Sequence, residues 1–192
     1  MMISPTIKKL IFSTLPILFL TLTACSNQQQ RQFNPFDNSI FTQEQTQNDL
    51  LPAPDFTLET MEGTSFTLSE QKGKIVILNI WATWCAPCRE EIPDFMEIQE
   101  EMEEHLLFVG VSVDEKGWDV VVPFAEEFEI NYPIVLDDGT VSEKYGPIMG
   151  IPMSFIINEE GDVAYVIPGM IRKELLQRTL KEMISENQIT EK

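Results

Sequence analysis

The distribution of apolar residues predicts alternating strands and helices from residue 51 onward. Nearly continuous apolar runs at 74–80 and 106–113 are typical of strands that are buried on both faces of a sheet. Between them, from Pro87 to about Glu104, apolar residues recur three and four positions apart among acidic ones, which predicts a helix with one buried face. Pro93 falls inside this helix and is expected to kink it.

Shorter patterns complete the predicted domain. Segments 56–58 and 66–68 flank Gly63 and predict a hairpin that turns at this glycine. The remaining expected elements are helices at 120–128 and 172–185 and strands at 132–136, 153–158 and 163–168, with a turn at 159–162 between the last two. This order implies an α/β domain, in which helices flank a central mixed sheet.

The N-terminal region has the pattern of an export signal. Lys8 and Lys9 precede the 13-residue apolar run Leu10–Leu22, which is shorter than the roughly 20 residues of a membrane-spanning helix. Residues 25–50 are rich in Gln, Asn and Thr and have no periodicity, so they are expected to form a flexible tether. The predicted organisation is a signal peptide at 1–24, the tether at 25–50 and one domain at 51–192.

Composition and charge narrow the function. The 192 residues are 43% hydrophobic, and 13 basic residues stand against 31 acidic ones, a net charge of -18. Such a chain is apolar enough to fold, and its charge repels phosphate backbones, so we expect no nucleic acid partner. Removal of residues 1–24 takes away Lys8 and Lys9 and no acid, which leaves 11 basic residues against 31 acidic ones, or -20.

Two of the three cysteines form a motif with chemical meaning. Cys85 and Cys88 make a Cys-x-x-Cys between the predicted strand 74–80 and the helix that follows it. At a helix N-terminus the dipole and unpaired N–H groups lower the pKa of a thiol, which favours Cys85 as the attacking sulfur. Cys88, one turn later, is expected to be more buried, to resolve the mixed disulfide and to leave a Cys85–Cys88 disulfide.

Two other readings of the motif fit less well. A structural zinc site needs four ligands. Beside the pair the chain offers only His105 and Cys25, and Cys25 is reserved for lipid, so the set falls short of four and we expect no metal. A purely structural disulfide across two residues closes a loop too small to stabilise the fold much. The sequence therefore favours redox chemistry by the thiols themselves, with no other cofactor.

The third cysteine carries a different signal. Leu22-Thr23-Ala24-Cys25 resembles the lipobox of bacterial lipoproteins, in which the cysteine thiol is lipidated and becomes the first residue after cleavage. The alternative is an ordinary secretory signal with a chance cysteine at its end. The lipobox implies a lipid anchor on Cys25 in the cell membrane, with the domain on the extracytoplasmic side.

Residues 51–186, and above all WATWCAPCREEIP at 81–93, resemble the ResA/TlpA family of membrane-tethered thiol-disulfide oxidoreductases. The resemblance implies a thioredoxin-like fold with an extra N-terminal hairpin at 55–69. It also implies a cis-proline at Pro152 opposite the cysteines and contact between substrate and the backbone of Ile151. This chain has Met153 where many relatives have Thr.

The resemblance also points to residues around the thiols. Glu91 lies three residues after Cys88 on the predicted helix, where an acid borders the active site in ResA-like proteins. A buried carboxylate there would accept the proton of Cys88; the alternative is a solvated charge like Glu90. Trp84 is expected to give substrate an apolar contact, and Trp81 to belong to the core.

The expected function is therefore reduction of disulfides in exported proteins, with a membrane thiol protein as electron donor. The resemblance makes apocytochrome c, during cytochrome c maturation, the favoured substrate. Two alternatives stay open. A thiol peroxidase would need Thr-x-x-Cys, but Ala82 stands three residues before Cys85. A copper-delivery module would need Cys-x-x-x-Cys and a distant His, for which His105 is poorly placed.

Overall fold

A six-stranded mixed sheet forms the centre of the domain. The computed structural model describes residues 50–146 and 148–190, so the predicted signal peptide, Cys25 and the tether lie outside the described residues. In spatial order the strands are β1 (Leu51–Pro52), β8 (Asp162–Pro168), β7 (Met153–Ile157), β4 (Ile75–Trp81), β5 (Leu106–Ser112) and β6 (Ile134–Leu136). Neighbours β4, β5 and β6 pair in parallel, and the other pairs are antiparallel, which confirms the predicted mixed sheet.

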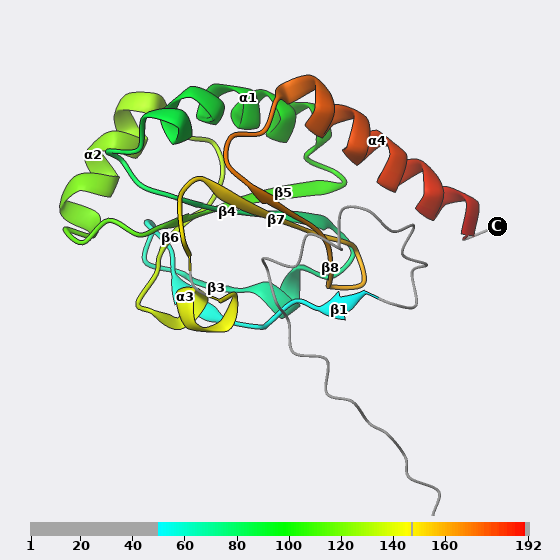
Figure 1. Ribbon diagram of the computed structural model, residues 1–192, viewed down its shortest axis with the longest axis horizontal. Coiled ribbons are helices and arrows are strands. Elements are labelled where there is room, and N and C mark those ends of the chain that lie inside the picture. Colours follow the sequence, from blue (N-terminus) through cyan, green and yellow to red (C-terminus); the bar gives the residue numbers. More distant parts are fainter. Residues whose placement is uncertain (1–49, 147, 191–192) are drawn as a thin grey trace, which may run out of the picture. The chain divides into compact units, whose positions relative to one another are not determined.

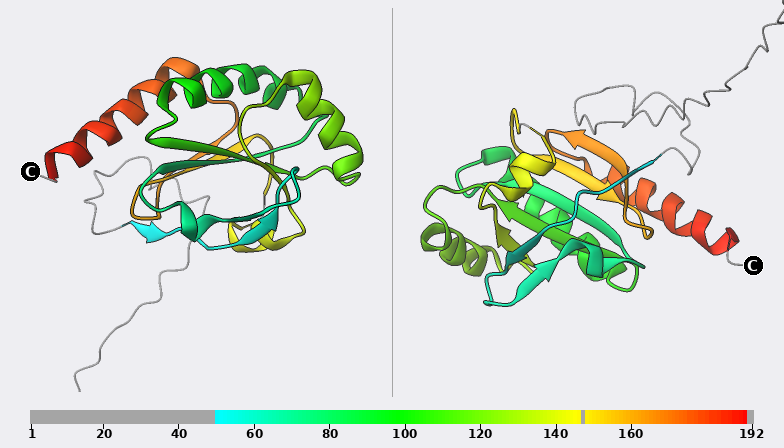
Figure 2. Two further views of the ribbon diagram at one scale, coloured as in Figure 1. Left: turned by 180° about the vertical axis from the view of Figure 1, so that it is seen from behind. Right: turned by 90° about the horizontal axis from the view of Figure 1, so that it is seen from below.

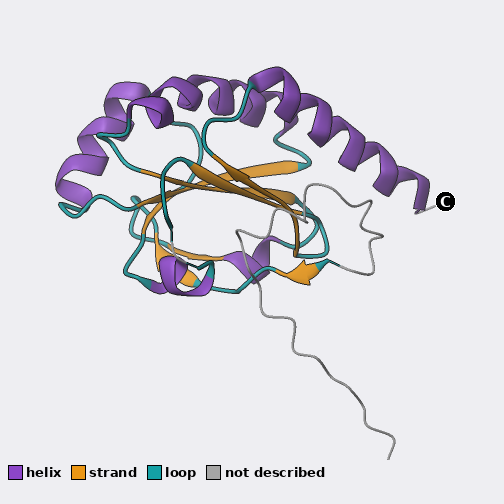
Figure 3. Cartoon of the chain, in the orientation of Figure 1, coloured by secondary structure: helices purple, strands orange, loops and turns teal. Residues whose placement is uncertain are grey.

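Three helices cover one face of this sheet (Figures 1 and 3). They are α1 (Ala86–Met102), α2 (Trp118–Phe128) and α4 (Lys173–Thr190). The opposite face carries the hairpin of β2 (Thr57–Glu59) and β3 (Ser65–Thr67), the 3₁₀ helix η3 (Leu68–Gln71) and the short helix α3 (Thr140–Lys144), as the views in Figure 2 also show.

Strand β4 joins the two layers because its side chains alternate between them. Ile75 and Ile77 pack with residues of α1 and α4, whereas Val76, Leu78 and Ile80 pack with the hairpin. All seven residues of β4 are buried, as the continuous apolar run predicts for a central strand. The carboxyl end of β4 leads directly to the segment before α1. The two cysteines therefore lie just beyond the carboxyl end of this central strand.

The hairpin is confirmed but does not join the central sheet. It forms a two-stranded sheet of its own, with Gly63 at φ 77° in the turn. Thr60 bridges to Val135 of β6, and the N–H of Met61 donates to the carbonyl of Ile134 at 3.1 Å. The hairpin thus covers the edge of β6, where unpaired backbone groups would otherwise be exposed.

The structure differs from the predicted elements mainly at their ends. The strand expected from residue 132 begins at Ile134, and the last helix extends to Thr190. Pro93 lies inside α1, as the sequence predicted. Elements β1, η3 and α3 were not predicted, because segments of two to five residues show no periodicity. Within the described ranges, no helix is both long enough and apolar enough to cross a bilayer.

Candidate active site

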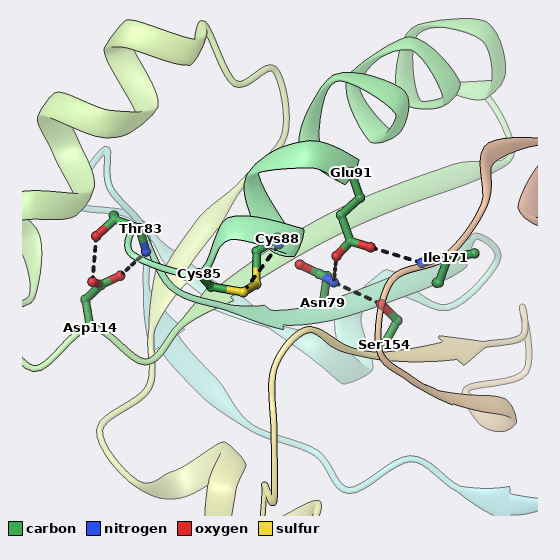
Figure 4. Close-up of a disulfide and its surroundings, with 8 residues drawn as sticks. All are labelled: Asn79, Thr83, Cys85, Cys88, Glu91, Asp114, Ser154 and Ile171. Carbon is green, nitrogen blue, oxygen red and sulfur yellow. Dashed lines mark hydrogen bonds between the residues drawn. A yellow bond between two sulfur atoms is a disulfide. The ribbon is translucent and has the colours of Figure 1, made fainter.

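The two cysteines lie where β4 ends and α1 begins. Cys85 is the N-cap residue of α1, and Pro87 occupies the first turn, where its missing N–H would have had no partner in the helix. The Sγ atoms of Cys85 and Cys88 form a disulfide, and the two Cα atoms are 5.3 Å apart. The backbone N–H of Cys88 donates to the Sγ of Cys85 at 3.3 Å (Figure 4). A thiolate at this position would therefore accept a hydrogen bond from the helix terminus as well as gain from its dipole.

The two cysteines are buried, whereas Trp84 beside them is exposed. Cys85 is 4% exposed and Cys88 is fully buried, whereas the neighbouring Trp84 is 69% exposed. The cysteines belong to a buried cluster between α1, α2 and the sheet, whose other members are Trp81, Ala82, Ile92, Val121, Phe124, Ala125 and Ile134. Trp81 is thus a core residue, as predicted, and Trp84 presents an indole to solvent next to the disulfide.

The segment before β7 lies against the same cluster. The Ile151–Pro152 peptide bond is cis, as the family resemblance implied. Pro152 is buried, and its carbonyl accepts a hydrogen bond from the N–H of Gly169 at 2.8 Å. Ile151 is half-buried and packs against the cluster that contains both cysteines. The fold therefore brings the Cys85–Cys88 pair and the cis-proline segment to one site, although they are more than 60 residues apart in the chain.

Glu91 is buried beneath the site rather than solvated. It is 1% exposed, and its Oε1 accepts a hydrogen bond from the Nδ2 of Asn79 at 3.0 Å. Its Oε2 accepts one from the backbone N–H of Ile171 at 3.2 Å. Burial raises the pKa of Glu91 to about 7, against the lowering effect of these two hydrogen bonds and with a further raising effect from Asp94. The alternative of a solvated charge does not fit this burial, whereas Glu90 is exposed.

A chain of hydrogen bonds fixes the Glu91 carboxyl group. The Nδ2 of Asn79 also donates to the Oγ of Ser154 in β7, at 2.9 Å. Asn79 and Ser154 are 3% and 0% exposed, so the network lies wholly in the protein interior. Figure 4 shows the Glu91 side chain directed toward Asn79 and Ile171 in the oxidised form. A carboxyl group held in this way, with a pKa near neutrality, is suited to exchanging protons.

A second carboxyl group holds the segment that leads into the cysteines. Asp114 follows β5 and is 9% exposed. Its Oδ2 accepts from the backbone N–H of Thr83 at 2.9 Å, and its Oδ1 accepts from the Thr83 hydroxyl at 2.7 Å. Figure 4 shows these two bonds between Thr83 and Asp114. The hydroxyl of Ser112 also donates to Oδ2, at 2.9 Å.

The sequence analysis missed Asn79, Ser154, Thr83 and Asp114. Asn79 could have been noticed, because it is the single polar residue in the apolar run 75–81. Asp114 could have been noticed because it follows a buried strand that runs parallel to β4, and so ends near the cysteines. Their partners are 31 and 75 residues away in sequence, and no local pattern predicts those pairings.

His105 does not lie beside the two cysteines in the fold. Among residues 50–146 and 148–190, no group of three His, Cys, Asp or Glu side chains is arranged to hold a metal ion. The carbonyl of His105 bonds the N–H of Ile75 at the start of β4, whereas the cysteines follow the other end of this seven-residue strand. His105 is therefore separated from the thiols by the length of the strand, roughly 20 Å.

Comparison with known proteins places most of the described domain in one family. Residues 51–166 match the model of the AhpC/TSA family. The thiol-disulfide oxidoreductase ResA of Bacillus thuringiensis subsp. konkukian is 32% identical over 145 residues, which cover 74% of this chain and 83% of that protein.

Solved structures have the same architecture. A crystal structure of a thiol:disulfide interchange protein DsbE from Chlorobium tepidum superimposes with a TM-score of 0.65 and 30% identity, covering 70% of this chain and 96% of that one. The exposed lipoprotein thioredoxin of Streptococcus pneumoniae superimposes with a TM-score of 0.58 and 32% identity, covering 67% of this chain and 99% of that one.

Proposed function

The chain belongs to the AhpC/TSA family, has a thioredoxin-like fold and is a thiol-disulfide oxidoreductase of the ResA/DsbE type, and on this premise we propose that Cys85 and Cys88 are its redox pair and reduce disulfides of exported proteins. The observation that carries the proposal is the disulfide itself, which joins the N-cap residue of α1 to a fully buried cysteine one turn later.

The reaction begins with the reduced pair. The Cys85 thiolate attacks the substrate disulfide, so that a Cys85–substrate bond forms, the substrate S–S bond breaks and the departing sulfur takes up a proton. Cys88 then loses its proton and attacks the Sγ of Cys85. The Cys85–Cys88 bond forms, the mixed disulfide breaks, and the substrate leaves as a dithiol with two electrons from the pair. A membrane thiol protein would return the domain to its reduced form.

Glu91 is proposed to accept the proton that Cys88 loses when it attacks the mixed disulfide. The two residues are one helical turn apart on α1, and both are buried. A carboxyl group with a pKa of about 7 exists in both protonation states near neutral pH, so it is able to accept a proton as Cys88 attacks and release it afterward. Its hydrogen bonds to Asn79 and Ile171 keep it in place between turnovers.

Substrate is proposed to bind across the exposed Trp84 and the backbone of Ile151 and Pro152. The indole of Trp84 is 69% exposed beside the disulfide and offers an apolar surface for a polypeptide. Because Cys85 itself is only 4% exposed, a substrate sulfur must approach it closely along this surface. The acidic domain is compatible with a basic partner, and apocytochrome c is the substrate that the ResA resemblance favours.

The domain is proposed to work on the extracytoplasmic side of the cell membrane, tethered by lipid on Cys25. The lipobox Leu22–Cys25 supports this, as does the similarity to a pneumococcal thioredoxin that is described as an exposed lipoprotein. The polar residues 26–50 would then separate the domain from the membrane surface.

Trapping of substrates with Cys88→Ala tests the proposal. Without the resolving thiol, the mixed disulfide on Cys85 should persist, and exported proteins should be released from it by dithiothreitol. The Cys85→Ala/Cys88→Ala double variant is the matched control and should trap none of them. If Cys88→Ala captures no exported protein, or captures the same proteins as the control, the assignment of the redox pair is wrong.

A further inference from the structure

The loop that carries Trp84 and Cys85 is tied to a different part of the sheet. This loop, residues 82–85, links β4 to α1, and within it the N–H of Cys85 donates to the carbonyl of Ala82 at 3.1 Å. Thr83, in its middle, donates twice to Asp114, at 2.9 Å from its N–H and 2.7 Å from its hydroxyl. One carboxyl group thus restrains both the main chain and the side chain of the residue two positions before Cys85.

Three hydrogen bonds hold the Asp114 carboxyl group. Its two oxygens bond the N–H and the hydroxyl of Thr83 and the hydroxyl of Ser112, an arrangement that suits an ionised carboxylate because that group accepts hydrogen bonds and donates none. Ser112 is 1% exposed, and its Oγ in turn accepts from the N–H of Asp114 at 3.1 Å. Thr83 and Ser112 thus hold the Asp114 carboxyl group in place just beyond the carboxyl end of β5, in a setting that favours a negative charge.

Two other charged side chains close to the pair in sequence, Arg89 and Glu91, have other partners. The Arg89 guanidinium, on the residue after Cys88, lies over the rings of Phe124 and Phe128 in α2, at 5.6 and 5.5 Å from their centroids. Glu91 is bound to Asn79 and to the backbone of Ile171. Among these groups, Asp114 is the one that contacts the loop leading into Cys85.

We propose that Asp114 is a positioning residue for the redox pair, which, by fixing Thr83 and by its negative charge, favours the Cys85–Cys88 disulfide and so makes the dithiol a stronger reductant. The inference rests on the proposed function of the pair and assigns the side chain that tunes it. It does not require Asp114 to touch substrate.

Both effects act in the same direction. A fixed loop keeps the Sγ of Cys85 close to that of Cys88, which raises the effective concentration of one thiol at the other and favours ring closure. A negative charge on Asp114, which contacts the residue two positions before Cys85, disfavours the Cys85 thiolate but not the neutral disulfide, so it destabilises the reduced form. A dithiol whose reduced form is destabilised gives up its electrons more readily and is a stronger reductant. DsbA is the opposite case, since its reduced form is stabilised and it is a strong oxidant.

The test measures an equilibrium constant for reduction, with the full chain in detergent. In this equilibrium the Cys85–Cys88 disulfide and two molecules of reduced glutathione give the dithiol and one molecule of glutathione disulfide. Asp114→Asn removes the charge and one acceptor, and we expect its equilibrium constant for reduction to rise about tenfold, equivalent to a potential about 30 mV less negative. Thr83→Val removes only the hydroxyl bond and should give a smaller rise, of about threefold, on the same scale. Glu115→Gln removes a charge from the adjacent exposed residue and should leave the constant unchanged.

Several results would overturn the inference. An Asp114→Asn constant equal to that of the wild type, or a Thr83→Val constant equal to it, would show that the contact does not tune the pair. If the constant rose equally in Glu115→Gln, the effect would come from the overall charge of the domain and not from the contact between Asp114 and Thr83. If Asp114→Asn does not fold, the milder Thr83→Val still decides the question. A wild-type protein with no reversible thiol couple would instead contradict the proposed function itself.

Discussion

The backbone N–H of Ile171 donates to the Oε2 of Glu91 at 3.2 Å, across 80 residues of sequence. This bond joins helix α1, which carries the redox pair, to the segment that leads into α4. It places a carboxyl group with a pKa of about 7 in the protein interior, one turn after Cys88. Two predictions follow from this burial.

The stability of the domain should fall as pH rises toward neutrality. The pKa of Glu91 rises from 4.5 to about 7 on folding, so between these values the folded state holds a proton that the unfolded state has lost. The stabilising contribution is complete below pH 4.5 and is lost as pH rises through about 7. It amounts to about 3 kcal/mol. Chemical denaturation at a series of pH values measures it, and Glu91→Gln should lack this component. An unchanged pH dependence in the variant would contradict the assignment.

The rate of disulfide reduction should depend on Glu91 in the same pH range. If Glu91 accepts the proton of Cys88, the wild-type rate profile should have an inflection near pH 7 that Glu91→Gln lacks, with a rate roughly 10- to 100-fold lower at neutral pH. Stopped-flow measurement with a model disulfide gives both profiles. Glu90→Gln, which changes the adjacent exposed acid, is the control and should retain the wild-type inflection.

Trp84 should matter for substrate binding but little for folding. Its side chain is 69% exposed, so Trp84→Ala should change the free energy of unfolding by no more than about 0.5 kcal/mol. The loss of an exposed aromatic contact should raise KM for a protein disulfide by roughly 10-fold. Leu175→Ala, which removes an exposed apolar side chain from α4, should leave KM unchanged. Equal KM values for Trp84→Ala and wild type would remove Trp84 from the substrate surface.

Cys25 should carry the lipid anchor. Cells fed labelled fatty acid should incorporate label into the wild-type protein and into Cys85→Ser/Cys88→Ser, but not into Cys25→Ser. The unlabelled variant should also leave the membrane fraction. Label on Cys25→Ser equal to that on the wild type would place the lipid elsewhere.

Gly110 should be required for the core next to the site. A Cβ atom at this position would lie 2.8 Å from the Nε1 of Trp81, a core side chain that cannot easily move. We expect Gly110→Ala to cost about 2 to 3 kcal/mol of stability, measured by denaturation. Gly150→Ala is the control, because a Cβ there would meet nothing within 4 Å, and it should cost far less. Equal losses in the two variants would mean that contact with Trp81 is not the cause.

Local patterns were enough to predict the framework of the domain. The apolar run of β4, the spacing of apolar residues along α1 and the Cys-x-x-Cys between them lie within about 30 residues, so short-range periodicity predicted a redox pair at a helix N-terminus. The mixed sheet and the hairpin at Gly63 were predicted for the same reason, since each element has its own period or turn residue. The position of Pro152 came from resemblance to a family rather than from any pattern in this chain.

The state of the site was decided by the tertiary structure. A glutamate three residues after Cys88 is equally compatible with solvent and with the interior. In the folded domain Glu91 is 1% exposed, and this burial raises its pKa against the lowering effect of the hydrogen bonds from Ile171 and Asn79. The same holds for Asp114, whose bonds to Thr83 exist because β4 and β5 run parallel and end side by side. Sequence spacing determines which side chains share a helix or strand, but desolvation and hydrogen bonding depend on which elements pack together, and these contacts span 12 to 80 residues.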